Sequence, residues 1–550
     1  MKKLVTLLLA AGMVLGSFAG AQAIDFKVKG EFQQDFGISD GLKFVRSGRD
    51  GKARYGNGGT STSYGFDNFE ANSRIRFQID AVASENLSGT VFFEIGQYSW
   101  GKGGGNSNIG MQKNFGAYGG GSSTRNLGAG VRYAYIDWFV PQTDLKFRMG
   151  LQYIGLPSYT FSWNPVCNYE GTGVVASYKF NDNVSLTAFW ARPLNDNAPA
   201  ELAPAGSRWS SANAAGEMDN VDMFGLIVPL SFDGFKIAPY GIIGAIGPRA
   251  FSEGTGWGST PTLPGIIAPR FYQTRNNNAA NNANPTGYAT AWWLGFTGEI
   301  TAADPFRFAW EGVYGSVTHP RHSYLNRSGW YINLLAEYKL DWGVPGLYFW
   351  WASGDDSNPK NGSERLPMLA QNTGDYPLSN FGFSGSLSNT AYDGAAFGQD
   401  PSGTWGIGLR LRDMSFLEDL KHTLRVHIMG GTNSPTMAKY ILGKKNIGGN
   451  ITATSGRYNN TTGVNDFYNN GAVYMTTQDY AVEINFDSSY KIYENLELVV
   501  ELGYMHLWLD QSRSVWGAAR AGTYPGQANT IRGVSTTDAV KANVTFMYRF

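Results

Sequence analysis

The sequence predicts an all-β fold, a transmembrane antiparallel β-barrel of about 18 strands, with 16 as the alternative count. Three observations predict it: segments in which apolar and polar residues alternate, a regular exchange of short and long connections, and a last strand that ends on Phe550. The 71 Gly residues and the aromatic content of 14% are typical of a β protein with many turns. Because no Pro-rich or charged linker divides the chain, one large architecture is favoured over several soluble domains.

The N-terminus has the three-part layout of a secretory signal. Lys2 and Lys3 precede an apolar run from Leu4 to Phe18, and small residues end the segment at Ala23. A membrane-anchoring helix is the alternative, but the apolar run is short for a span and an alternating segment follows at once. We therefore expect residues 1–23 to be a cleaved signal peptide and residues 24–550 to form the barrel of an exported protein.

Many segments alternate with period two, which places successive side chains on opposite faces of a strand. In residues 74–81, Arg74 and Arg76 alternate with Ile75 and Phe77. Similar alternation occurs near residues 145–152, 407–412, 482–487 and 496–502. A barrel in lipid requires apolar side chains outside and polar ones inside, but a soluble sandwich also alternates.

The lengths of the connections distinguish the two architectures. Eight short connections rich in Asn, Asp, Gly and Ser exchange strictly with nine longer Gly- and Asn-rich stretches. This pattern is typical of short periplasmic turns and long external loops, and it leaves both termini on the periplasmic side. In the turn Asp413 to Leu420 we expect one helical turn with Ser415 as N-cap. The long stretches lie near residues 37–70, 99–130, 154–172, 192–218, 248–288, 318–327, 354–402, 433–476 and 508–535.

Aromatic residues gather near the predicted strand ends, where they would form girdles at the two membrane interfaces. A soluble core that holds the same aromatic residues is the alternative. The residues are Trp138, Trp190, Trp292, Trp293, Tyr338, Trp342, Trp350, Trp351, Tyr504 and Trp508.

The last strand has Val540, Val544, Phe546 and Tyr548 on one face and ends on Phe550 itself. A terminal Phe with an aromatic residue two positions earlier resembles the signal read by the machinery that assembles outer-membrane proteins. Further short motifs cover most of the mature chain and resemble the homotrimeric outer-membrane porins of sulfate-reducing bacteria. They are Arg74-Ile75-Arg76-Phe77, Phe92-Phe93-Glu94-Ile95, Arg148-Met149-Gly150-Leu151-Gln152 and Gly354-Asp355-Asp356-Ser357-Asn358, together with the Ala-Gln-Ala that precedes the first strand.

The resemblance implies a homotrimer of passive diffusion pores in the outer membrane of a Gram-negative cell. Its partners would be outer-membrane lipid and lipopolysaccharide, the assembly machinery that reads Phe550, and small hydrophilic solutes. The residues agree with a pore, because about 18 strands enclose more space than side chains can fill. They do not address trimerisation.

Residues 154–172 are the candidate constriction of this pore. The segment contains Leu156, Tyr159, Phe161, Trp163 and Tyr169, more large apolar groups than a solvated loop usually holds. We expect it to fold into the lumen, as the third external loop does in porins generally. The alternative is that it packs outside against another subunit.

Charged residues of lumen parity are the candidate selectivity site, because charged rings in a narrow channel bias which ions enter. The alternative is that they pair across neighbouring strands and only stiffen the wall. We expect Arg74, Arg76 and Arg148 to form a basic wall near the constriction and to favour anions. The selected residues are Arg74, Arg76, Lys146, Arg148, Arg410, Arg412, Glu94, Asp137 and Glu170. Further residues of the same parity are Lys27, Lys29, Arg425, Lys541, Arg549, Glu31, Asp80, Glu311, Glu483, Asp487, Glu497 and Glu501.

Other function classes find little support. The chain has equal numbers of basic and acidic residues, which excludes the basic footprint that nucleic-acid binding requires. No motif indicates an enzyme, a cofactor or a metal, since His422 and His427 lie on opposite faces of one strand. Cys167 is the only cysteine and is expected to be buried, with intermolecular pairing as the alternative. A sugar- or anion-selective channel and a surface β-structural protein remain as alternative functions.

Overall fold

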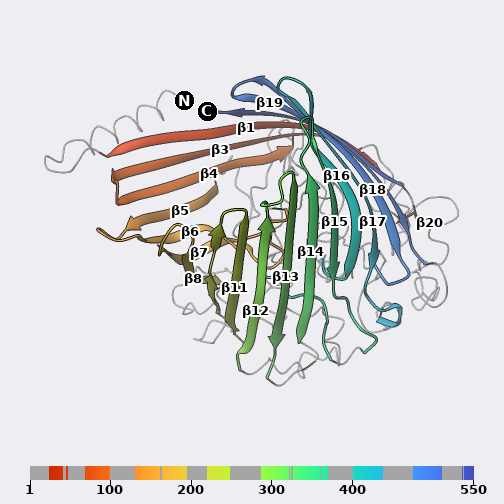
Figure 1. Cartoon of the computed structure of the whole chain (residues 1–550), viewed down its shortest axis with the longest axis horizontal. Helices are drawn as coiled ribbons and strands as arrows, with labels where there is room; N and C mark the ends of the chain where they lie inside the picture. The colour runs from red at the N-terminus through yellow and green to blue at the C-terminus, as the bar shows by residue number, and fades with distance from the viewer. Residues whose placement is uncertain are drawn as a thin grey trace, which may run out of the picture.

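The computed structural model is a closed antiparallel β-barrel of 18 strands, as the sequence predicts (Figure 1). Strands β9 and β10 pair with the same neighbour, β11, and count as one strand interrupted at Val228 and Pro229. The short strands β2 and β20 form a separate ribbon outside the barrel sheet. The structure describes residues 24–40, 45–46, 68–99, 130–161, 164–194, 220–247, 287–320, 323, 326–358, 361–369, 401–437, 475–510, 535–536 and 538–550.

The strands follow the order of the chain around the barrel, each antiparallel to the next. Their bounds are β1 Asp25–Asp40, β2 Val45–Arg46, β3 Asn68–Ser84, β4 Leu87–Ser99, β5 Gly130–Phe139, β6 Leu145–Gly155, β7 Asn168–Lys179, β8 Ser185–Leu194, β9 Val221–Ile227, β10 Leu230–Phe232, β11 Phe235–Ile246, β12 Ala289–Ile300, β13 Phe306–Thr318, β14 Arg327–Tyr338, β15 Val344–Ala352, β16 Thr404–Leu417, β17 Leu420–Gly431, β18 Tyr480–Tyr493, β19 Leu496–Trp508, β20 Ser535–Thr536 and β21 Ala539–Arg549.

Short and long connections exchange around the barrel as the sequence predicts. Eight short connections lie at one rim, which we call the turn rim, and nine longer ones at the other, the loop rim. The first strand starts and the last strand ends at the turn rim. Figure 1 shows the central strands β11 to β18 side by side, with β1, β3 and β4 fanning out beside them. The predicted exchange of turns and loops is therefore confirmed.

The barrel closes between β21 and β1. Ten residue pairs align the two strands, from Glu31 with Arg549 to Asp40 with Val540. Phe550 continues the pairing, because its N–H donates to Gly30 O at 3.0 Å and its carbonyl accepts from Gly30 N–H at 2.9 Å. The Phe550 ring lies over Gly30, where a Cβ atom would come within 2.5 Å of it.

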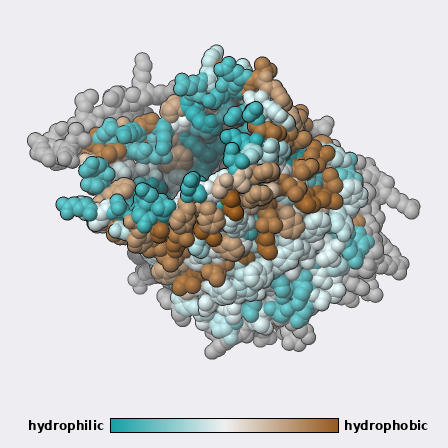
Figure 2. Space-filling view, in the orientation of Figure 1, coloured by the Kyte–Doolittle hydropathy of each residue, from teal (hydrophilic) through white to brown (hydrophobic). Residues whose placement is uncertain are grey.

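Large apolar side chains cover the outside of the barrel, whereas its inside holds the buried polar side chains together with further apolar ones. Along β12, Trp292, Leu294 and Phe296 are exposed, whereas Trp293 and Thr297 are buried. Figure 2 shows hydrophilic residues around a hollow in this face and a belt of hydrophobic residues on the surface beside it. The buried polar residues of the strands include Gln33, Arg74, Glu311, Asn333, Glu337, Arg425, Glu483, Asn485, Asp487, Glu501 and Asn543.

Seven of the ten predicted girdle residues are exposed on the outer face, Trp351 is partly buried, and two are buried. Trp138, Trp190, Trp292, Tyr338, Trp342, Tyr504 and Trp508 are exposed. Trp293 and Trp350 are buried and point inward, so their predicted girdle positions are wrong. The reason is local: each belongs to a Trp-Trp pair, and successive residues of a strand face opposite ways. Trp293 Nε1 donates to Pro367 O at 2.8 Å, and Trp350 Nε1 donates to Thr404 Oγ1 at 3.1 Å.

The helical turn expected between Asp413 and Leu420 is also wrong. Strand β16 continues through Ser415 to Leu417, with register shifts against β17 on both sides of Met414. Pairing with β17 therefore overrides the local capping signal. No helix in the described ranges is long and apolar enough to cross a membrane.

Candidate pore-lining site

In the segment between β6 and β7, which we call segment 156–167, the described residues 156–161 and 164–167 lie against the inner wall of the barrel. Strand β6 extends to Gly155 and β7 begins at Asn168, so this segment is shorter than the predicted 154–172. Asn164 Nδ2 donates to Glu311 Oε1 at 2.6 Å and to the Tyr240 hydroxyl at 3.0 Å. Ser158 Oγ donates to the other Glu311 oxygen at 2.9 Å. The segment is thus bonded to β11 and β13, well away from its own strands.

Glu311 is the main acceptor for this segment. Its side chain is 1% exposed and also accepts a long hydrogen bond of 3.5 Å from Thr160. Among the described residues, Glu311 contacts no cationic side chain, so neutral donors of segment 156–167 compensate the buried carboxylate. Hydrogen bonds to a charged group each contribute about 1.5–3 kcal/mol, which makes this cluster the strongest single anchor of the segment.

Backbone bonds fix the neighbouring residues of the segment. Tyr159 N–H donates to Thr297 Oγ1 at 2.9 Å, and the Tyr159 carbonyl accepts from the Arg307 guanidinium. Asn333 Nδ2 donates to Thr160 Oγ1 at 3.2 Å. Four consecutive strands, β11 to β14, therefore hold one side of the segment.

Phe161 extends the contacts of the segment to β15 and β16, the strands that follow β14. Its ring meets the Tyr348 ring edge-on, with centroids 5.9 Å apart, and the Arg410 guanidinium lies 5.2 Å from its centroid. Arg410 belongs to β16, which stands nine strands from β6 in the ring of 18. Half of the ring separates the two strands, so the described part of the segment reaches a strand on the far side of the ring from β6. The predicted Trp163 lies outside the described residues.

A second segment, residues 363–369, also turns inward, although sequence analysis assigned it to an external loop. Arg327 of β14 is fully buried and donates to the Leu366 carbonyl at 2.8 Å, and Trp293 donates to the Pro367 carbonyl. Leu369 N–H donates to the Val166 carbonyl at 2.7 Å. The two inward segments are therefore joined to each other as well as to the wall.

The predicted basic residues of β3 and β6 line the inner wall, but each is paired. Arg74 is buried beside Gln33 and 3.8 Å from Glu31. Arg76 Nε lies 2.7 Å from Glu94 Oε2. Lys146 and Arg148 both contact Asp137, at 3.1 Å and 2.7 Å. The pairing that was left open as an alternative is what the structure shows at these residues.

Arg132 is the basic residue that sequence analysis missed. Its guanidinium lies 2.9 Å from Glu94 Oε2 and also contacts Glu170, whose carboxylate accepts from the Tyr133 hydroxyl at 2.8 Å. By alternation Arg132 would share a face with Ile136 and Trp138, which are exposed. A register shift between β4 and β5 at this point redirects its side chain.

A second charge cluster lies near the turn rim on the other side of the barrel. Glu337 is almost fully buried and accepts from Arg307, Arg410 and Arg412 at 2.7–2.8 Å. Arg307 also contacts Glu299 at 2.9 Å, and Lys236 contacts the same carboxylate at 3.0 Å. Arg410 and Arg412 are predicted from the sequence, whereas Glu337, the carboxylate that holds them, is not, because it lies at the end of a strand beside a turn.

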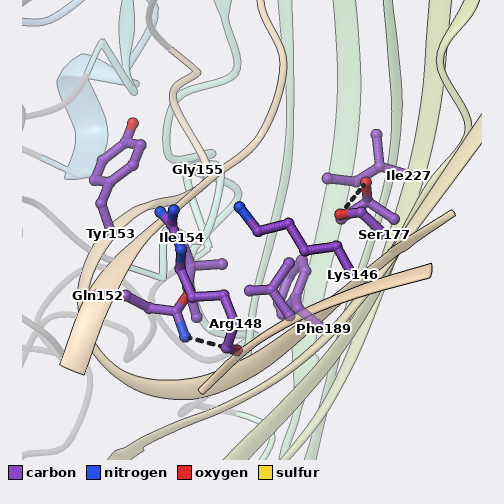
Figure 3. Close-up of a pocket in the computed structure, with 11 residues that line it drawn as sticks. Lys146, Arg148, Gln152, Tyr153, Ile154, Gly155, Ser177, Phe189 and Ile227 are labelled. Atoms are coloured by element: carbon purple, nitrogen blue, oxygen red, sulfur yellow. Dashed lines mark hydrogen bonds between the residues drawn. The ribbon is translucent and has the colours of Figure 1, made fainter. Parts of the chain in front are cut away.

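A pocket of about 350 Å³ opens on the lumen side of β6 to β9 (Figure 3). Figure 3 shows the Lys146 amine and the Arg148 guanidinium extending from β6 toward the space in front of Phe189. Two hydroxyls, Ser177 Oγ and Thr187 Oγ1, lie 3.2 Å apart on its far side. The pocket thus combines cationic, polar and apolar walls.

Other candidate chemistry is sparse. Cys167 is fully buried, its Sγ lies 3.3 Å from the Ile154 carbonyl, and burial raises the pKa of its thiol to about 12. His422 and His427 occupy opposite faces of β17 as predicted. Within the described ranges, no group of three His, Cys, Asp or Glu side chains could hold a metal ion.

Comparison with known proteins gives no family. No family model matches the chain, and no curated protein matches it. Similar solved structures include OpdQ of Pseudomonas aeruginosa, with 11% identity, a TM-score of 0.44 and coverage of 96% of this chain and 98% of that chain. The outer membrane protein OprD of the same organism has 9% identity and a TM-score of 0.47, with coverage of 97% of this chain and 95% of that chain. OccAB3 of Acinetobacter baumannii has 10% identity and a TM-score of 0.43, with coverage of 96% of this chain and 100% of that chain. At such low values we infer no property of this chain from them.

Proposed function

We propose that this protein is an outer-membrane porin, a water-filled channel for passive diffusion of small hydrophilic solutes and ions. The barrel of 18 strands supports a channel, because 16 to 18 strands enclose an aqueous lumen that side chains cannot fill. The large apolar side chains on the outer face of the barrel support a membrane location, since exposed Trp292, Leu294 and Phe296 require an apolar surrounding.

The course of segment 156–167 is the single observation that supports a selective pore. Its anchors on β13 and its contact with β16 support a course across the lumen. We propose that it forms the constriction together with segment 363–369, which it joins through Val166 and Leu369. A solute that passes the barrel would then pass between these segments and the walls that they leave uncovered.

Planar-bilayer conductance tests this proposal. We expect replacement of residues 158–165 by a short Gly-Ser linker to raise the single-channel conductance and the size limit for neutral solutes. A deletion of residues 276–282, an Asn-rich stretch predicted to be external, serves as a control of similar length. Heat-modifiable gel migration would establish that both variants still fold. Unchanged conductance in the folded 158–165 variant would contradict the constriction, and no conductance in the wild type would contradict the porin.

We extend the proposal to a weak anion preference. The six selected lumen bases are paired with carboxylates, so neither cluster presents a large excess of one sign. Each of two carboxylates nevertheless has more than one cationic partner. Glu337 contacts Arg307, Arg410 and Arg412, and Asp137 contacts Lys146 and Arg148. A reversal potential that indicates cation preference in a salt gradient would contradict this part.

A solute-selective channel of the same architecture is the second candidate function. The pocket beside Lys146 and Arg148 favours it, because a general diffusion pore needs no recess that is lined by cationic, polar and apolar side chains. Transport of one solute that saturates with concentration would favour this candidate over the first.

Export and assembly complete the proposal. Residues 1–23 would be removed on export, and Phe550 would be read by the assembly machinery before β21 pairs with β1. The homotrimer follows from the family resemblance alone. Conductance steps in groups of three, together with cross-linking of the purified protein, would test it.

A further inference from the structure

We propose that the pocket on β6 to β9 is a binding subsite for small organic anions that also carry a hydrogen-bond donor, such as 2-hydroxy acids with an apolar body. This inference rests on the proposed channel function and gives it a substrate class. Three walls of the pocket support it, each with a different chemistry.

The first wall supplies cations for a carboxylate. Lys146 and Arg148 share one carboxylate, Asp137, so the cluster carries one net positive charge. Arg148 uses Nε and Nη2 to bind the two Asp137 oxygens, each at 2.7 Å. Its Nη1 and the further hydrogens of the Lys146 amine remain able to donate to an anion in the pocket. Both side chains are only partly buried, which leaves them accessible from the lumen.

The second wall supplies an acceptor. Gln152 lines the pocket and is 1% exposed. Its Nε2 donates to the carbonyls of Gly173 at 2.9 Å and Arg148 at 3.2 Å, which fixes the orientation of the amide. Among the described residues, its Oε1 has no hydrogen-bond partner. A buried acceptor without a donor is uncommon in folded proteins, and a hydroxyl or ammonium group of a solute would satisfy it.

The third wall is apolar. Val175, Phe189 and Ile227 line the pocket from β7, β8 and β9. Phe189 is buried and lies below the Lys146 side chain in the view of Figure 3. A solute with a hydrocarbon body would cover these side chains while its charged end remains at β6.

Block of single-channel chloride current by three matched solutes tests the subsite. Mandelate has the carboxylate, the hydroxyl and the ring. Phenylacetate lacks the hydroxyl, and phenylethanediol lacks the charge. We expect mandelate to bind about three- to tenfold more tightly than phenylacetate, the effect of one additional hydrogen bond to a buried acceptor. Phenylethanediol should block least.

Three variants assign these differences to their residues. Gln152→Met keeps the length of the side chain and should bring the mandelate-to-phenylacetate ratio close to one. Arg148→Gln should weaken both anions and retain the ratio. Arg412→Gln removes the same kind of charge from the opposite wall and should also retain the ratio. Heat-modifiable migration would confirm that each variant is folded.

The outcomes separate this inference from the channel proposal. A wild-type protein that conducts but is blocked equally by mandelate and phenylacetate would overturn the subsite and leave the porin intact. A ratio that survives in folded Gln152→Met would also overturn it. A wild-type protein without conductance would overturn the porin itself.

Discussion

Asn164 of segment 156–167 donates to Glu311 of β13 at 2.6 Å, and this bond joins a loop to the wall on the far side of the lumen. The same carboxylate accepts from Ser158 at 2.9 Å. A carboxylate that is buried among neutral donors from one segment is a specific anchor for that segment. Its removal should affect the lumen before it affects the barrel.

We therefore expect Glu311→Ala to raise single-channel conductance and current noise, because segment 156–167 loses its main acceptor. Glu311→Gln should have a smaller effect, since its amide oxygen can still accept one of the bonds. Asp137→Asn serves as a control, because it changes a lumen carboxylate that segment 156–167 does not contact among the described residues. It should shift ion selectivity without added noise. An unaltered trace in Glu311→Ala would exclude the anchor.

Arg132 should set part of the ion selectivity. Its removal in Arg132→Ala leaves the carboxylates of Glu94 and Glu170 without their shared partner. We expect the reversal potential in a salt gradient to move toward cation preference. Arg192→Ala is the matched control, because Arg192 pairs with Asp222 on the face of β8 that exposes Trp190. An equal shift in both variants would show that the position of Arg132 is irrelevant.

Gly30 should be required for the close packing of the Phe550 ring against the backbone of β1. A Cβ atom at Gly30 would lie 2.5 Å from the Phe550 ring and 2.8 Å from the Arg76 carbonyl oxygen. We expect Gly30→Ala to destabilise the barrel by about 1–3 kcal/mol through overpacking, and to lower the temperature of heat-modifiable migration. Gly89→Ala, where a Cβ atom meets nothing within 4 Å, should leave that temperature unchanged. Equal temperatures for the two variants would contradict the tight seat.

The loop rim should carry a pH dependence at Glu364. Burial, together with nearby Asp355 and Asp356, raises the pKa of Glu364 to about 7. Because the folded pKa lies above the ordinary value of 4.5, protonated Glu364 stabilises the folded loop. This stabilisation is fully present below about pH 4.5 and is lost as the pH rises through about 7. Hydrogen exchange of residues 353–369, corrected for intrinsic rates, should be slower at pH 5 than at pH 8.

Glu364→Gln should remove this difference in exchange, because the amide does not ionise. Asp182→Asn, in an exposed turn at the opposite rim, should keep the wild-type difference. A difference that persists unchanged in Glu364→Gln would assign the pH dependence to another group.

The sequence by itself determined the barrel. Strand alternation, turn chemistry and connection length are local properties, and each is determined by residues within about ten positions of one another. They were sufficient for the 18 strands, the eight turns and nine loops, and the pairing of the last strand with the first. Local signals failed where a neighbouring strand decided the outcome, as at Ser415 and Arg132.

Only the tertiary structure decided what occupies the lumen. Ser158 and Glu311 lie 153 positions apart, and no local pattern relates them. The inward turn of residues 363–369, the inward rings of Trp293 and Trp350, and the three cations around Glu337 likewise depend on segments brought together by closure of the barrel. Period two identifies the face that a side chain occupies, whereas its partner across the lumen is fixed by the ring of strands and the course of the loops inside it.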